Sequence, residues 1–203
     1  MEAVGRILGM VLVVGLIVAG CGEGGNDNGI SFRAVGILQG ELQDNKCQVP
    51  QADEAIADQS IEIPLDHPAL NFGFPTGVFL CRGYIWLENN LNGQAIVVDR
   101  FDFEYEIPGA RIGIPSHSSS VVVRINPADS TVPSPFGPPN TYIGQPDAQM
   151  VPANLILFLR QNRQVLPELP YPLIVRITTR GRTDAGERVT TNEIRYTIQL
   201  TPS

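Results

Sequence analysis

Alternation of apolar and charged side chains with a period of two residues restricts the fold of this chain more than any other feature. It is clearest within residues 97–107, where charged and apolar side chains alternate from Arg100 to Ile107. The apolar set is Phe101, Phe103, Tyr105 and Ile107, and the charged set is Arg100, Asp102, Glu104 and Glu106. Successive side chains of a strand point to opposite faces of its sheet, so the pattern predicts a half-buried antiparallel strand.

The same period returns twice near the carboxyl end of the chain. Leu173, Val175 and Ile177 alternate with Arg176, Thr178 and Arg180, and later Ile194, Tyr196, Ile198 and Leu200 alternate with Glu193, Arg195, Thr197 and Gln199. Between the two runs, Asp184-Ala185-Gly186 has the composition of a turn. These features predict a hairpin.

Shorter strand signals occupy residues 30–38, 60–65, 78–88 and 119–125. Asn92-Gly93 predicts a second hairpin turn, which would join the strand over 78–88 to the strand that begins near Ala95. Residues 155–159 form a continuous apolar run. Periodicity alone leaves open whether this run is a central strand or one side of a short helix.

Seven or eight strands with hairpin connections over residues 30–203 predict a mainly β fold, an antiparallel two-sheet sandwich. The pattern resembles immunoglobulin-like and fibronectin-like domains, a resemblance that implies that the carboxyl-terminal hairpin forms the last two strands. The Cys–Trp–Cys order of antibody domains is absent, because Trp86 follows both Cys47 and Cys81.

Residues 1–20 have the pattern of a signal peptide, with an unbroken run of small and apolar residues from Ile7 to Gly20. As a helix, this run would reach about 21 Å at ~1.5 Å per residue, which is short of the roughly 30 Å hydrocarbon core of a bilayer. We therefore expect a cleaved segment.

The run ends in Val18-Ala19-Gly20-Cys21, which resembles the lipobox of bacterial lipoproteins. The resemblance implies cleavage before Cys21, attachment of lipid to its sulfur and of acyl chains such as palmitate, and anchoring in a membrane. In cell envelopes like those of enteric bacteria, an aspartate directly after the lipidated cysteine retains a lipoprotein at the inner membrane. This chain has Gly22 at that position, so the resemblance implies export to the outer membrane. Simple secretion after cleavage and an uncleaved anchor are the alternatives.

Residues 22–29 contain no apolar side chain and are typical of a flexible tether. Eight such residues have an end-to-end distance of roughly 15–17 Å. Residues 21–29 therefore form a lipidated cysteine and its tether, and residues 30–203 a single domain close to the membrane surface.

If Cys21 carries lipid, Cys47 and Cys81 are the two cysteines that remain. An oxidising compartment favours a structural disulfide between them, and two separately buried thiols are the alternative. The sequence contains no CxxC motif, so it suggests neither a redox pair nor a zinc site.

The chain has a net charge of −7 and a single lysine, Lys46. This balance is unfavourable for binding nucleic-acid backbones or anionic headgroups, and we expect no nucleic-acid partner.

Residues 126–153 hold seven of the seventeen prolines, so we expect mainly an extended connection. It is either a stiff crossover that covers a sandwich edge or a loop that binds a partner. Phe136, Tyr142 and Ile143 are the candidate contacts in the second case.

A second candidate surface lies around Tyr84 and Trp86, which share one strand face, opposite the face of Cys81, Ile85 and Leu87. Either both faces of this strand are buried, or the two aromatic residues form an exposed platform that stacks on sugar rings or on a partner protein.

The sequence offers little for catalysis, a metal or a cofactor, and we expect none of the three. His67 and His117 are the two histidines; neither has metal-binding spacing, and no serine lies in a GxSxG turn. The carboxylates of Asp102, Glu104 and Glu106 are expected to pair with arginines on neighbouring strands.

The favoured hypothesis is a non-catalytic, lipid-anchored scaffold or protein-interaction module of the cell envelope, with other envelope proteins as partners. A carbohydrate- or ligand-binding module is the first alternative. An envelope hydrolase that depends on His117 is the second.

The disulfide hypothesis is directly testable. A Cys47–Cys81 bridge would enclose about 35 residues and stabilise the fold by roughly 3.5–4 kcal/mol. We expect a non-reduced digest to contain a peptide pair joined through these cysteines, and Cys47→Ser to lower the free energy of unfolding. Two free thiols that react with iodoacetamide in the native protein would contradict it.

Overall fold

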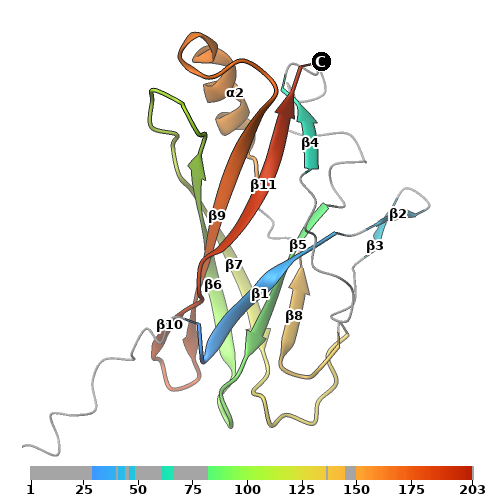
Figure 1. Cartoon of the computed structure of the whole chain (residues 1–203). Coiled ribbons are helices and arrows are strands. Elements are labelled where there is room, and N and C mark those ends of the chain that lie inside the picture. The colour runs from blue at the N-terminus through green and yellow to red at the C-terminus, as the bar shows by residue number, and fades with distance from the viewer. Residues whose placement is uncertain are drawn as a thin grey trace, which may run out of the picture.

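The computed structural model describes residues 29–39, 41–43, 46–48, 61–65, 82–135, 137–144 and 150–202. Within these residues the chain is mainly β, with one large and one small sheet, a two-stranded ribbon and a short α-helix (Figure 1). The signal peptide and the tether over residues 22–28 lie outside the described residues, so both stay predictions.

The large sheet contains the strands in which the sequence pattern is strongest. Its order is β4-β11-β9-β6-β7, with β10 beside β9. The bounds are β4 Ile61–Pro64, β6 Ile96–Glu106, β7 His117–Ile125, β9 Tyr171–Thr183, β10 Arg188–Thr190 and β11 Ile194–Thr201. All pairings in it are antiparallel except that of β4 with β11, which is parallel.

The small sheet has the order β1-β5-β8, with antiparallel pairing throughout. Its strands are β1 Phe32–Gln39, β5 Arg82–Asn89 and β8 Thr141–Gly144. The two-stranded ribbon joins β2 Glu41–Gln43 to β3 Lys46–Gln48.

The two sheets share one apolar core. Phe32, Ile85 and Leu87 of the small sheet are fully buried in the same cluster as Phe101 and Phe103 of the large sheet. Facing sheets that enclose one core form a sandwich, so the mainly β two-sheet sandwich predicted from the sequence is confirmed.

The apolar run at 155–159 is helical. Helix α2, Ala153–Gln161, buries Leu155, Ile156 and Leu159, and Figure 1 shows it at the upper end of β9. It begins directly after Pro152, whose lack of an N–H costs nothing there, and Asn162 closes its end with a 2.8 Å bond from Nδ2 to the Phe158 carbonyl. A 3-10 turn, Arg163–Val165, follows.

The carboxyl-terminal hairpin is confirmed, with an interruption in its return strand. Gly186 has a φ of +85° in the turn after β9, and the chain returns first as β10 and then as β11, both paired with β9. In the break between β10 and β11, the Thr191 hydroxyl accepts from the Thr179 amide of β9, and Asn192 lies beside Ala34 in β1 of the small sheet.

The Asn92-Gly93 hairpin prediction is wrong. The turn is present, with a Gly93 φ of +68°, but β5 pairs with β1 and β8 whereas β6 pairs with β7 and β9. The connection therefore carries the chain from one sheet to the other. An Asn-Gly pair specifies a tight turn, but it does not specify that the flanking strands hydrogen-bond to each other.

The proline-rich segment crosses between the sheets, as the first of its two interpretations requires. It leaves β7 of the large sheet, adds β8 to the edge of the small sheet and returns to α2. The expectation of a mainly extended connection missed β8, because the four residues of that strand contain no proline.

Two asparagine side chains form hydrogen bonds that connect the small sheet to segments of the large sheet. Asn192 donates from Nδ2 to the Ala34 carbonyl at 3.0 Å and accepts from the Ala34 amide at 2.9 Å. Asn89, fully buried, donates from Nδ2 to the carbonyls of Gln94 and Asn126 at 2.8 and 3.0 Å, and its Oδ1 accepts from Leu91. Asn89 thus joins β5, the crossover to β6 and the end of β7.

We predict that Asn89→Ala lowers the free energy of unfolding by about 2–4 kcal/mol, because it leaves buried carbonyls and an amide without partners. Denaturant unfolding followed by Trp86 fluorescence measures this change. Asn90→Ala is the matched control, since the Asn90 side chain makes an exposed bond to the Ile30 carbonyl and should lose less than about 1 kcal/mol. Equal losses in the two variants would contradict the assigned role of Asn89.

Candidate functional site

Several residues predicted to carry function lie outside what the structure describes. These are Cys21, Cys81, Phe136 and His67. Cys47 belongs to β3 by its backbone, and its side chain is not described. The lipid site and the Cys47–Cys81 disulfide therefore stay predictions.

The surface around Tyr84 and Trp86 is largely buried. Tyr84 is 4% exposed, and it packs with Leu38, Ile143 and the half-buried Trp86 on the face of the small sheet that points away from the large one. Burial raises the pKa of the Tyr84 hydroxyl. The exposure of these residues favours the interpretation in which both faces of β5 are buried over that of an open aromatic platform.

The two described loop candidates lie in β8 and point to opposite faces. Ile143 is fully buried beside Trp86, and Tyr142 is half-buried against the main core opposite Leu87. Neither side chain stands clear of the fold as a free contact residue would.

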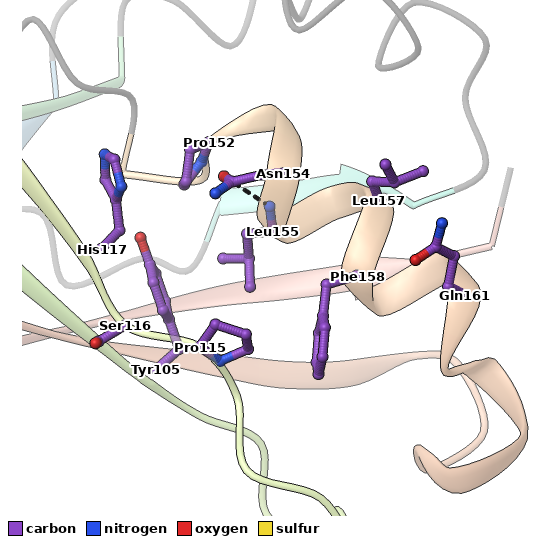
Figure 2. Close-up of a pocket in the computed structure, with 10 residues that line it drawn as sticks. All are labelled: Tyr105, Pro115, Ser116, His117, Pro152, Asn154, Leu155, Leu157, Phe158 and Gln161. Carbon is purple, nitrogen blue, oxygen red and sulfur yellow. Dashed lines mark hydrogen bonds between the residues drawn. The ribbon is translucent and has the colours of Figure 1, made fainter.

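A cavity of about 270 Å³ lies between α2 and the large sheet. Figure 2 shows Leu155 and Phe158 pointing from the helix toward Pro115, with Tyr105 and His117 side by side at the other end. The Tyr105 hydroxyl donates to the Met150 carbonyl at 2.8 Å, and burial raises its pKa. The tyrosine is therefore a structural hydrogen-bond donor and is held in its neutral form.

His117 is placed by packing. Its ring stacks on Phe103 with centroids 6.1 Å apart. The neighbouring Ser118 points to the opposite face of β7 and donates to the Asp102 carboxylate at 2.7 Å. Ser118 and His117 therefore do not form the nucleophile–base pair that a hydrolase of this type would need.

The outward face of the large sheet carries ion pairs. Asp102 contacts Nε of Arg100 at 3.0 Å and Nε of Arg180 at 2.6 Å, and Glu106 pairs with Arg176. The predicted pairing of strand carboxylates with arginines is confirmed for these two acids. Asp102 lies opposite Thr178 of β9, and Arg180 follows two residues later on the same face of that strand, so the two strands hold this pair together.

A β-bulge opens a groove in this face. Between Val98 and Arg100 the pairing of β6 with β9 shifts by one residue, which leaves Asp99 as an extra, exposed residue. The groove has a volume of about 450 Å³. Its lining residues come from β6, β9 and β10 and are Asp99, Arg100, Arg180, Gly181, Arg182, Arg188, Val189 and Thr190.

Four arginines thus meet around one depression, a site that the sequence pattern did not predict. Alternation does place Arg180 and Arg182 on one face of β9. The register that brings Arg188 opposite Arg182, and the bulge that brings Arg100 opposite Arg180, are visible only in the folded chain. This arrangement of planar, permanently charged donors is suited to binding oxyanions.

Among the described residues no group of three or more potential metal ligands occurs. In the same part of the chain, no helix is long and apolar enough to span a membrane. No family model matches the chain, and neither the curated proteins nor the solved structures include a significant match.

One ion pair next to the groove gives a pH prediction. Arg124 donates to both carboxylate oxygens of Asp184, at 2.7 and 2.8 Å, and these hydrogen bonds hold the pKa of Asp184 below its ordinary value of 3.8. Because the pKa of Asp184 is lower in the folded state, the ion pair stabilises the fold at pH values above the unfolded-state pKa. This stabilisation is lost as the pH falls through the folded-state pKa.

We expect an NMR titration of the Asp184 carboxyl carbon to give a pKa below 3.8, and Arg124→Gln to move it up toward that value. Arg124→Lys keeps the charge without the two-pronged geometry and should give an intermediate shift. An unchanged Asp184 pKa in Arg124→Gln would show that the pair is not formed in solution.

Proposed function

We propose that the protein is a lipid-anchored component of the cell envelope whose β-sandwich is a non-catalytic interaction module. The lipobox-like Val18-Ala19-Gly20-Cys21 supports the anchor, and the polar tether that follows supports a position near the membrane.

The observation that carries this proposal is where the fold begins. Gly29, the last residue of the predicted tether, has a φ of +86°, and a Cβ added there would meet the Asn192 backbone nitrogen at 2.6 Å. The sandwich is therefore in contact with the chain from Gly29 onward, and β1 starts at Phe32. The eight residues that follow a lipidated Cys21 up to this point would keep the domain close to the membrane surface.

The exposed side of the large sheet supports an interaction role. It presents charged side chains on long, paired strands, and rigid strands hold such groups in fixed relative positions. The four-arginine groove is the most concentrated feature of this surface. A rigid, charged surface on a tethered domain is suited to recruiting an anionic partner at the membrane.

We expect mass analysis of the protein purified from its natural membranes to give an amino-terminal Cys21 that carries diacylglycerol and an acyl chain. Cys21→Ala should abolish that mass and release the protein from the membrane fraction, whereas Cys47→Ala, the control, should keep the lipid. A chain that begins at another residue, or an unmodified Cys21 thiol, would contradict the anchor. Crosslinking in intact membranes that yields no stable partner would count against the interaction module.

A further inference from the structure

The arginine groove concentrates positive charge in a protein whose net charge is −7. Four guanidinium groups line it, and within the part of the chain that the structure describes the carboxylates in contact with them are those of Asp99 and Asp102. The cluster therefore keeps an excess of two positive charges. A small ligand or a surface that meets this face experiences the local excess, because charges further away are screened beyond about 8–10 Å at physiological ionic strength.

The ion pairs leave most of the donors of the groove unused. Arg100 and Arg180 contact Asp102 through Nε, and Arg182 contacts Asp99 through Nε at 3.6 Å. A guanidinium has five N–H donors in a planar fork, so the terminal nitrogens of each remain available. Arg188 is exposed, and among the described residues no hydrogen bond or ion pair engages its guanidinium group. Such forks match the oxygens of a phosphate group.

The groove lies at the end of the sandwich where the chain enters the fold. Thr190, which lines the groove, is two residues from Asn192, and Asn192 touches Gly29 and binds Ala34 of β1. Figure 1 shows β10 next to the start of β1, at the opposite end of the molecule from α2.

We propose that the groove formed by Arg100, Arg180, Arg182 and Arg188 binds the phosphate groups of anionic lipids in the membrane to which the protein is tethered. This inference rests on the proposed lipid anchor. With the end-to-end distance of roughly 15–17 Å expected from its composition, the tether would hold Gly29, and with it the β10 end of the sandwich, within reach of the headgroups. Each arginine close to an anionic membrane surface strengthens binding by roughly fivefold.

Docking through this groove fixes the orientation of the sandwich. The outward face of the large sheet meets the lipid near β10, and α2 with its cavity lies at the other end of the molecule. The Arg124–Asp184 pair holds the turn that joins the two groove strands β9 and β10. Asp184 lies in this turn, and it also accepts from the Ala95 amide at 3.3 Å.

The test takes the mature protein purified from its natural membranes and compares it in phosphatidylcholine vesicles with and without phosphatidylglycerol. Hydrogen exchange of the amides over residues 180–190 is measured. We expect several-fold slower exchange in the anionic vesicles, and loss of this protection at high ionic strength. Arg182→Gln with Arg188→Gln should abolish it. Arg176→Gln with Arg195→Gln is the matched control, because it removes the same charge from the same sheet face outside the groove and should keep the protection.

Protection that is equal in both vesicle types, or that survives in the groove variant, would overturn the proposal. Inorganic pyrophosphate, added to neutral vesicles, separates the two sources of phosphate: protection by pyrophosphate but not by anionic lipid would assign the groove to a soluble ligand and also overturn it. The mass of the amino-terminal peptide is measured in the same samples. A lipidated protein without protection refutes the docking alone, whereas an unlipidated protein refutes the proposed anchor.

Discussion

The two sheets are held to each other by side chains, because within the described residues no strand of one sheet pairs with a strand of the other. Most of that attachment is apolar: the inward faces of β1 and β5 bury Phe32, Ile85 and Leu87 against the phenylalanines of β6. Apolar packing has little directional preference, so it does not by itself fix how far one sheet slides over the other. Two asparagines supply that register. Asn192, between β10 and β11 of the large sheet, bonds the amide and the carbonyl of Ala34 in β1. Asn89 of β5 bonds the carbonyls of Gln94 and Asn126, which lie next to β6 and β7.

The sequence predicts those parts of the fold that depend on one strand at a time. Alternation located β6, β9 and β11, because a strand half-buried in a sheet shows its two faces directly in the chain. It failed where pairing between strands decides the outcome. The Asn92-Gly93 turn has the same sequence whether the next strand pairs with β5 or crosses to the other sheet. The crossing is accompanied by hydrogen bonds from the buried Asn89 side chain to Gln94 and Asn126, which belong to two later segments. The aromatic surface was ambiguous for the same reason, since burial of Tyr84 depends on neighbours from β1 and β8.

The groove shows how far a net charge can mislead. An overall charge of −7 with one lysine argues against anionic ligands, and that argument treats the surface as uniform. Folding distributes the charges unevenly: β9 and β10 place Arg182 opposite Arg188, and the bulge at Asp99 aligns Arg100 with Arg180. No single segment of the sequence contains this cluster. The candidate site is therefore a product of register, and the feature of the chain that hints at it is the presence of three arginines, Arg176, Arg180 and Arg182, on one face of β9.

The position of β11 has a consequence for the order in which the chain can fold. This strand lies between β9 and β4, and its partners are residues 171–177 on one side and 61–64 on the other. β4 thus has no place in the large sheet until residues near 200 are present, more than a hundred positions later. Such long-range closure is slow compared with the formation of local hairpins. The pairing of β4 therefore waits for the segment near residue 200, so the large sheet gains this edge strand only after β11 has been made.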